Sequence, residues 1–300
     1  METEPPRDAP TLVPLADGGC VAVQSYGDPA GEPVFFFHGW PSSRFQGAVA
    51  HDAARELGVH LLSLDRPGIG PSSLAVGRSL RDWPGVLARV ADHFGVEKFR
   101  VLGVSGGGPY ALVSAWALPE RVTAASVVSG APPLADRTDL AALMPAYRWL
   151  LTLYRRKPEW VRCLFRIGRG PATLRPPRWL WRLILFAIPA PDRRALDEPH
   201  VLDRAWAGYS GAWVGNPDGV FHDARIYAEP WGFDPREIRV PVRVWHGRED
   251  RNFRCELAEG LASRIPGCGA RMLDGEGHYS LFMLRNREIL LDLMSDKPAG

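Results

Sequence analysis

The sequence has few cysteines, no long apolar run and little net charge, and each of these shortages excludes a class of protein. The four cysteines lie far apart among 300 residues and form no CxxC pair, so we expect neither a disulfide framework nor a metal site built on them. The longest apolar stretch, residues 179–188, contains Arg182 and is much shorter than the roughly 20 residues that a membrane-spanning helix needs. We therefore expect no stable membrane insertion.

The charge balance gives no indication of a nucleic-acid partner. The formal net charge is +2, and the sequence contains no basic and aromatic motif of the kind that nucleic-acid-binding domains use. Residues 1–10 are acidic and rich in proline, and they lack the apolar core of a signal peptide. We expect them to form a flexible tail, and we expect the protein to be cytoplasmic.

Short runs of β-branched and aromatic residues alternate with stretches of helical periodicity. This alternation predicts an α/β fold with a mostly parallel sheet flanked by helices. The expected strands are residues 20–25, 33–37, 59–64, 99–104, 122–129, 240–245 and 270–273. Several of them are almost wholly apolar, as strands covered on both faces should be. Amphipathic helices are expected over residues 79–94 and 279–294.

The alternation stops after Ser129 and resumes at Val240. Repeated prolines in between would divide the segment into several helices, and an unstructured loop of about 110 residues is implausible in a compact domain. The sequence therefore predicts a core of residues 11–130 and 240–298, with a helical cap, residues 131–239, inserted into it.

Residues 103–107, Gly-Val-Ser-Gly-Gly, fit the pattern G-x-S-x-G. They lie between an expected strand and an expected helix, residues 108–118, which is the context that holds such a serine in a strained turn with its hydroxyl projecting. We predict that Ser105 is a nucleophile. The alternative is a glycine-rich turn that only joins strand to helix or cradles a phosphate, although no Gly-Lys-Ser/Thr of a Walker loop follows.

A serine hydroxyl needs a base before it can attack, and His278 is the candidate among eight histidines. It follows the last expected strand, so its loop should emerge at the carboxyl edge of the sheet, where ligands bind in open α/β folds. Its alternative role is to cap the following helix. Of the other histidines, His51, His60 and His93 are expected to be packed or surface residues, while the roles of His200 and His222 stay open.

The third member of such a site is an acid that orients the base. Asp250 lies just past the expected strand 240–245 and is the candidate, with Glu249 beside it and Asp136 after an earlier strand as alternatives. Structural roles are expected for three other polar residues near these loops: His38 and His246 in turns, and Asp274 as a loop cap.

Acyl transfer at a serine also needs hydrogen-bond donors for the oxyanion of the transition state. The backbone N–H groups of Trp40 and Gly106 are the candidates, because Trp40 follows a strand and Gly106 follows Ser105. Chemistry of this kind requires no metal ion and no organic cofactor, and we expect none.

Taken in order along the chain, these motifs resemble those of the α/β-hydrolase family. The matching segments are His38-Gly39-Trp40-Pro41, Asp65-Arg66-Pro67-Gly68-Ile69-Gly70, the Ser105 turn, His246-Gly247-Arg248-Glu249-Asp250 and Gly277-His278. The order Ser, Asp, His is that of the family. The stretch SGGGPYAL that begins at Ser105 is similar to a bacterial branch. Epoxide hydrolases and haloalkane dehalogenases resemble the chain at residues 38–41, but they use aspartate where this chain has Ser105.

The resemblance implies an α/β-hydrolase fold with an inserted helical cap, and a serine hydrolase with a small-molecule substrate. The expected reaction is hydrolysis of a carboxylic ester or thioester, of an apolar or aromatic compound, through an acyl-enzyme on Ser105. Cleavage of C–C or amide bonds, a cyclase or lyase step, and a slow-turnover ligand-binding protein are the alternatives, because fold and triad do not separate them. The sequence gives no indication of the oligomeric state.

The cap has an unusual composition. Seven of the 11 tryptophans lie between residues 131 and 239, either as aromatic walls of a substrate pocket or as the cap's own small core. From Arg148 to Arg194 there are twelve Arg or Lys residues and two acids. This basic run is expected to be a solvated face, with attraction of an anionic substrate or docking to an acidic membrane surface as alternatives.

Overall fold

The computed structural model describes residues 9–135, 137–177, 179, 180, 186 and 188–295. Most of the expected tail, residues 1–10, and the candidate acid Asp136 therefore lie outside the described residues. Within them, eight strands form one sheet in the order β1-β2-β4-β3-β5-β6-β7-β8. They are β1 (Thr11–Pro14), β2 (Cys20–Gly27), β3 (Glu32–Phe37), β4 (Val59–Leu64), β5 (Phe99–Val104), β6 (Val122–Val128), β7 (Val242–Gly247) and β8 (Gly269–Leu273).

The sheet is parallel from β4 to β8, and only the pairs β1/β2 and β2/β4 are antiparallel. The predicted fold class, a mostly parallel sheet flanked by helices, is confirmed. All seven expected strands are present, with ends shifted by two residues at most. The eighth, β1, was not predicted, because it is only four residues long and buries a single side chain, Val13.

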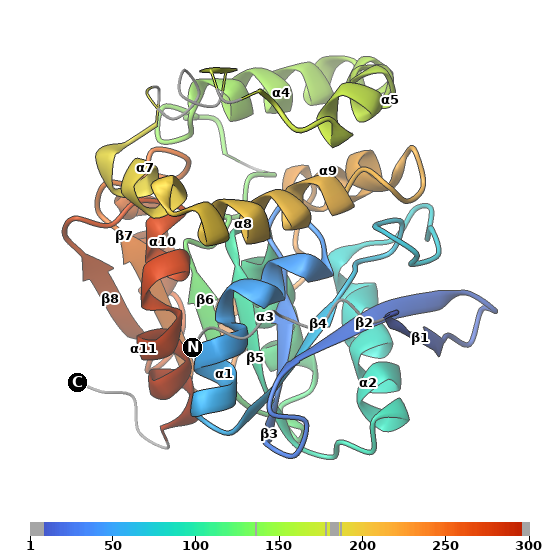
Figure 1. The fold of residues 1–300 in the computed structure, drawn as a ribbon, viewed down its shortest axis with the longest axis vertical. Helices are drawn as coiled ribbons and strands as arrows, with labels where there is room; N and C mark the ends of the chain where they lie inside the picture. Colours follow the sequence, from blue (N-terminus) through green and yellow to red (C-terminus); the bar gives the residue numbers. More distant parts are fainter. Residues whose placement is uncertain (1–8, 136, 178, 181–185, 187, 296–300) are drawn as a thin grey trace.

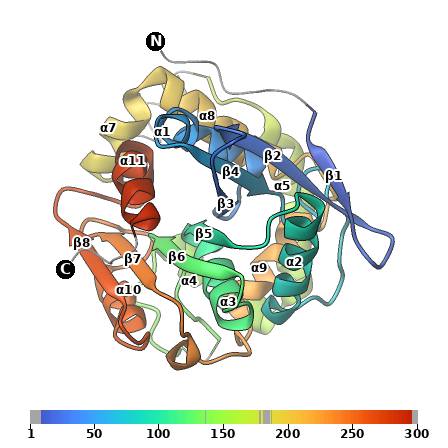
Figure 2. The ribbon, with the colours of Figure 1, turned by 90° about the horizontal axis from the view of Figure 1, so that it is seen from below.

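Helices cover both faces of the sheet (Figure 2). One face carries α1 (His51–Glu56) and α11 (Ser280–Met294), and the other carries α2 (Trp83–His93), α3 (Gly108–Ala117) and α10 (Cys255–Ala262). Each face has its own buried apolar cluster, so Phe35 packs with Val113 on one side while Phe36 packs with Leu290 on the other. Successive strand residues point to opposite faces. This double cover explains why the strand sequences are almost wholly apolar.

Between β6 and β7 the chain forms a group of helices at one end of the molecule (Figure 1). They are α4 (Pro145–Arg156), α5 (Pro158–Thr173), α7 (Ala190–Asp197), α8 (Pro199–Gly211) and α9 (Gly219–Ala228). Val161 and Phe165 of α5 pack with Phe221 of α9 in a small apolar cluster. The segment also contacts the rest of the chain where α7 meets α11 and where α8 meets the short helix η1 (Arg44–Ala50).

Three absences concern the part of the chain that the structure describes. No helix there has both the length and the apolar character needed to cross a membrane. No cluster of three or more His, Cys, Asp or Glu side chains is arranged to hold a metal ion. The four cysteines, all of them described, form no disulfide.

Candidate active site

Ser105 lies at a tight turn between β5 and α3. Its φ angle is +52°, a left-handed conformation that is costly for a residue with a side chain. The turn is crowded by backbone on both sides. A Cβ atom at Gly103 would overlap the carbonyl oxygen of Gly107, and a Cβ at Gly107 would overlap that of Phe37. Both glycines of G-x-S-x-G are therefore required by space.

This turn brings Ser105 to His278, although the two are 173 positions apart in the chain. The Oγ of Ser105 lies 2.9 Å from Nε2 of His278, and Nδ1 of His278 lies 2.7 Å from Oδ2 of Asp250. Because an ionised carboxylate only accepts hydrogen bonds, Nδ1 carries the proton, and Nε2 is left to accept from the Ser105 hydroxyl. The three candidate residues thus meet in an arrangement that can take the proton from the serine.

The surroundings of Asp250 keep its carboxylate charged. Oδ1 accepts from the backbone N–H groups of Asn252 (2.7 Å) and Phe253 (3.0 Å). Burial acts to raise the pKa of Asp250, but His278 and these backbone donors lower it below its ordinary value. Burial likewise acts to lower the pKa of His278, but the Asp250 carboxylate and its hydrogen bond raise it above the ordinary value. The Asp250 carboxylate therefore favours the protonated form of the His278 imidazole.

The alternative acid and the three residues expected to have structural roles do not take part in the Ser105–His278–Asp250 hydrogen bonds, although Nε2 of His246 lies 3.3 Å from Oδ2 of Asp250. Glu249 is exposed to solvent. Asp274 is exposed, with Oδ1 at 3.3 Å from Nε of Arg248. His38 is buried just past β3, with Nδ1 at 2.8 Å from the carbonyl oxygen of Gly39. His246 does not lie in a turn as expected but is buried in β7, with Nε2 at 2.8 Å from the carbonyl oxygen of Phe253. His200 lies on α8 and His222 on α9, whereas the ring that contacts Ser105 is that of His278.

The backbone N–H groups of Gly106 and Trp40 are neighbours beside Ser105. A Cβ atom at Gly106 would lie 3.0 Å from the backbone nitrogen of Trp40. The carbonyl oxygen of Ser105 accepts from the N–H of Ala131 at 2.9 Å. In a trans peptide the N–H points opposite to the carbonyl of the same unit, so the Gly106 N–H faces away from Ala131.

Arg66 fixes the direction of the Trp40 N–H, because it binds the carbonyl oxygen of Gly39, which belongs to the same peptide unit. Its buried guanidinium donates to the carbonyl oxygens of His38 and, at 2.8 Å, of Gly39. The same guanidinium is held from the other side by Asp223 of α9, through Nε at 2.9 Å and Nη2 at 2.7 Å. Burial acts to raise the pKa of Asp223, but the neighbouring arginines hold it well below its usual range. A buried ion pair thus links the inserted helices to the loop beside Ser105.

Asp192 of α7 holds the loop that carries His278. Its carboxylate accepts the backbone N–H groups of His278 (3.1 Å), Tyr279 (2.8 Å) and Ser280 (2.9 Å). The first N–H groups of α11 have no partner inside the helix, and this carboxylate supplies one. The side chain is only 1% exposed, and a Cβ at Gly277 would overlap it. Nothing in the local sequence predicts this contact, because its partners are 86 or more positions away.

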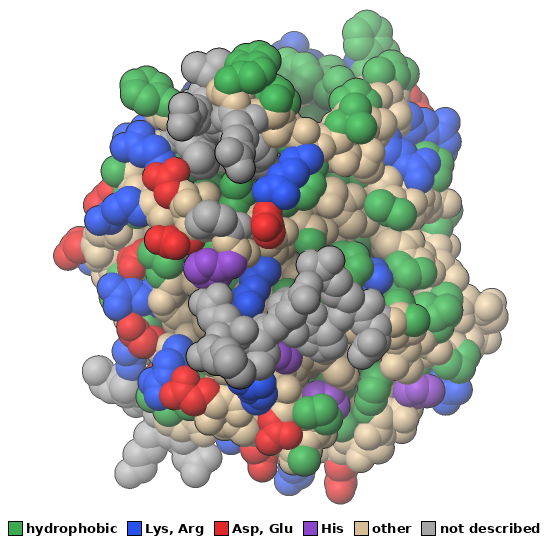
Figure 3. Space-filling view, viewed as in Figure 1, with side chains coloured by type: hydrophobic (Ala, Val, Ile, Leu, Met, Phe, Trp, Pro, Cys, Tyr) green, Lys and Arg blue, Asp and Glu red, His purple; other side chains and the backbone are tan. Residues whose placement is uncertain are grey.

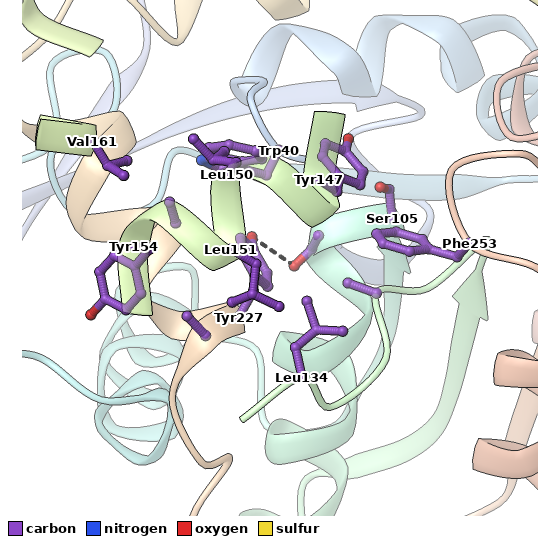
Figure 4. A pocket seen from close by; sticks show the side chains of 14 residues that line it. Trp40, Ser105, Leu134, Tyr147, Leu150, Leu151, Tyr154, Val161, Tyr227 and Phe253 are labelled. Atoms are coloured by element: carbon purple, nitrogen blue, oxygen red, sulfur yellow. Dashed lines mark hydrogen bonds between the residues drawn. The ribbon is translucent and has the colours of Figure 1, made fainter. Parts of the chain in front are cut away.

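An apolar pocket, partly open to solvent, lies beside Ser105 (Figure 4). Core and inserted segment both contribute to its lining, which consists of Trp40, Ser105, Gly106, Ala131, Leu134, Tyr147, Leu150, Leu151, Tyr154, Val161, Ala224, Tyr227, Ala228 and Phe253. These described lining residues include no Asp, Glu, Lys or Arg. The hydroxyl of Tyr227 donates to the carbonyl oxygen of Gly106 at 3.0 Å. The pocket is therefore suited to an uncharged group.

The tryptophans of the inserted segment do not form the pocket wall in the described part of the chain. The aromatic lining consists of other residues, namely Trp40, Tyr147, Tyr154, Tyr227 and Phe253. Trp213 and Trp231 are buried, but Trp149, Trp160 and Trp179 are more than half exposed. For these three exposed tryptophans, neither of the two predicted roles, pocket wall or core of the cap, is correct.

Several residues of the basic run hold the inserted helices together. Arg162 and Arg166 donate to Asp218 at 2.6 Å. Arg155 and Arg169 donate to backbone carbonyl oxygens, the nearest at 2.7 Å. None of the described basic residues lines the pocket, so the pocket itself offers no cation to an anionic substrate.

Solved structures of other proteins share this architecture. An esterase from Exiguobacterium antarcticum superposes with a TM-score of 0.68 at 18% identity, over 95% of this chain and all of that one. A bromoperoxidase from Bacillus anthracis gives a TM-score of 0.71 at 17% identity, over 95% of this chain and 99% of its own. At such identities the likeness shows the fold alone.

Proteins related in sequence, among them a hydrolase, match shorter stretches of the chain. The chain is 27% identical to the uncharacterized hydrolase YcgS of Bacillus subtilis (strain 168) over 170 residues, which are 56% of this chain and 50% of that protein. The chain spans half or less of the length of the curated relatives it matches. A family model for the alpha/beta hydrolase fold matches residues 32–282. With most of its length matched by that model, the chain belongs to the alpha/beta hydrolase fold family.

Proposed function

We propose that the protein is a serine hydrolase that cleaves a carboxylic ester or thioester through an acyl-enzyme on Ser105. The observation that carries this proposal is the continuous chain of hydrogen bonds from Ser105 through His278 to Asp250. Each of the three has a role in acyl transfer: a nucleophile, a general base and an acid that orients the base.

The reaction proceeds in two halves. As the Ser105 oxygen attacks the acyl carbon, Nε2 of His278 takes the hydroxyl proton and then donates it to the leaving alcohol or thiol. Asp250 stabilises the imidazolium meanwhile. In the second half, His278 takes a proton from water, the hydroxide attacks the acyl carbon, and Ser105 leaves with its proton restored. The N–H groups of Trp40 and Gly106 bind the oxyanion of both tetrahedral intermediates.

The apolar pocket supports a neutral, apolar or aromatic acyl or alcohol group as the part of the substrate that binds beside Ser105. Burying an unpaired carboxylate there would be costly, since no described lining residue is a cation. The pocket lining combines Trp40 and Phe253 with Leu151 and Tyr227 of the helical segment between β6 and β7. We therefore assign residues 131–239 as a cap over a core of residues 11–130 and 240–298.

The direct test is turnover of p-nitrophenyl butyrate by the wild type and two variants. Ser105→Ala should reduce kcat to the level of the buffer blank. Ser126→Ala is the matched control, because Ser126 is also a buried serine and its hydroxyl has no hydrogen-bond partner. Equal turnover by Ser105→Ala and the wild type would refute the proposal.

A second comparison tests the substrate class. The p-nitrophenyl ester of butyrate should be hydrolysed with a kcat/KM at least about tenfold higher than the monoester of succinate, which places a carboxylate in the pocket. Equal values for the two esters would contradict the assignment of this pocket to the acyl group.

A further inference from the structure

Helix α5 is apolar on the side that faces away from the protein. Trp160, Leu164 and Ile167 are 67%, 42% and 73% exposed, and their spacing of four and seven residues places them on one face of the helix. On another face of the helix, Val161 and Phe165 are buried in the cluster with α9. A surface helix normally presents polar residues to water, so this exposed apolar face calls for an explanation.

The neighbouring segments also carry exposed apolar side chains. Leu174, just past the end of α5, is 70% exposed, and Trp149 of α4 is 57% exposed. Helices α4 and α5 pack against each other and form the outermost layer at one end of the molecule (Figure 1). Figure 3 shows hydrophobic and basic side chains side by side along this end. We call Trp149, Trp160, Leu164, Ile167 and Leu174 the outer cap surface.

The charge around the outer cap surface is strongly positive. Residues 145–175 contain eight Arg or Lys residues and one acid, Glu159, in a chain whose net charge is only +2. Asp218 partly compensates Arg162 and Arg166, and Asp203 pairs with Arg175. Arg155 and Arg169 bind neutral carbonyl groups. Arg156, the last residue of α4, and Lys157, between α4 and α5, are exposed to solvent.

We propose that the outer cap surface docks onto an anionic lipid bilayer. Exposed tryptophans and aliphatic side chains enter the headgroup and acyl boundary, while the basic residues around them are attracted to acidic headgroups. A second copy of the chain fits this surface poorly, because two positive surfaces would repel each other. An acidic protein would satisfy the charge. The apolar side chains, however, protrude from the outermost helices. Protruding side chains can insert into a lipid bilayer, because lipid molecules move aside to accommodate them.

The test is flotation of the protein with vesicles of phosphatidylcholine, alone or mixed with phosphatidylglycerol, at low ionic strength. Binding should require phosphatidylglycerol and weaken about tenfold or more in Trp160→Ser/Ile167→Ser and in Lys157→Glu. The matched controls are Val76→Ser, which removes a 73% exposed apolar side chain outside this surface, and Lys98→Glu, which reverses an exposed charge before β5. Both controls should bind as the wild type does.

Three outcomes would overturn the proposal. One is the absence of binding to phosphatidylglycerol vesicles, or equal binding by all variants. Another is a dimer, measured by analytical ultracentrifugation, that Trp160→Ser/Ile167→Ser dissociates, because the surface would then belong to a second copy. The third is binding to polyglutamate but not to vesicles, which would indicate an acidic protein. Ester hydrolysis without vesicles should be unchanged in every variant, so this test is independent of the proposed function.

Discussion

Replacing Asp192 by alanine should loosen the loop that carries the base. The substitution removes the acceptor of three backbone N–H groups, at His278, Tyr279 and Ser280. Loss of a helix-capping carboxylate costs about 0.5–2 kcal/mol, and each buried donor left without a partner costs about 1–3 kcal/mol. Burial raises the pKa of Asp192, so relief of that unfavourable burial offsets part of the loss, and water entering the vacated space offsets more. We expect the free energy of unfolding to fall by about 3 kcal/mol.

The same substitution should affect catalysis, because the displaced backbone is that of His278. A shift of about 1 Å in a catalytic group can cost roughly 10²-fold in rate, and we expect kcat/KM for p-nitrophenyl butyrate to fall by about that factor. Asp192→Asn should be milder. It keeps the oxygen that binds Tyr279 and Ser280, and it loses only the bond to the His278 N–H.

Urea denaturation and steady-state kinetics measure the two effects. Asp197→Ala is the matched control, because Asp197 is an exposed acid on the same helix. If Asp192→Ala matched Asp197→Ala in both stability and kcat/KM, the assigned positioning role would be wrong.

Three further predictions concern other parts of the site. Since catalysis needs neutral His278, kcat/KM should rise with pH through the raised pKa of that residue. Asp250→Asn should shift this rise to lower pH and reduce the plateau of kcat/KM by roughly 10⁴-fold. An unchanged pH profile in the variant would argue against the pairing of Asp250 with His278. Arg66→Lys cannot reach two carbonyls and Asp223 at once, so kcat should fall about tenfold with little change in KM; wild-type kcat would show that the N–H of Trp40 needs no such support. Gly107→Ala should lower the yield of folded protein severely, because the added Cβ overlaps backbone atoms. The control Gly260→Ala has open space around the added Cβ and should fold normally. Equal thermal stability of the two variants would contradict the crowding at the Ser105 turn.

The features that could be predicted are those that depend on neighbouring residues along the chain. The strands could be predicted because burial on both faces makes them continuously apolar, and Ser105, Asp250 and His278 could be proposed because each follows a strand at the carboxyl edge of the sheet. The boundary of β7 was shifted by two residues, since Pro241 just before it lacks the N–H needed for strand pairing.

The supporting contacts could not be predicted because they join distant residues. Arg66 meets Asp223 across 157 positions and Asp192 meets His278 across 86, and one sequence carries no signal for either pair. The exposure of Trp149, Trp160 and Trp179 could not be predicted for a related reason. Helical periodicity shows that Trp160 and Ile167 share a face, but not whether that face points into the protein or out of it.

Intact-mass and peptide-mass analysis of an acid-quenched reaction tests the central claim most directly. When the protein is mixed with p-nitrophenyl butyrate and quenched during turnover, one butyryl group should be found on the peptide that contains Ser105, and Ser105→Ala should show neither the adduct nor turnover. Full turnover without an acylated Ser105 peptide, or an adduct on another residue that persists in Ser105→Ala, would contradict it.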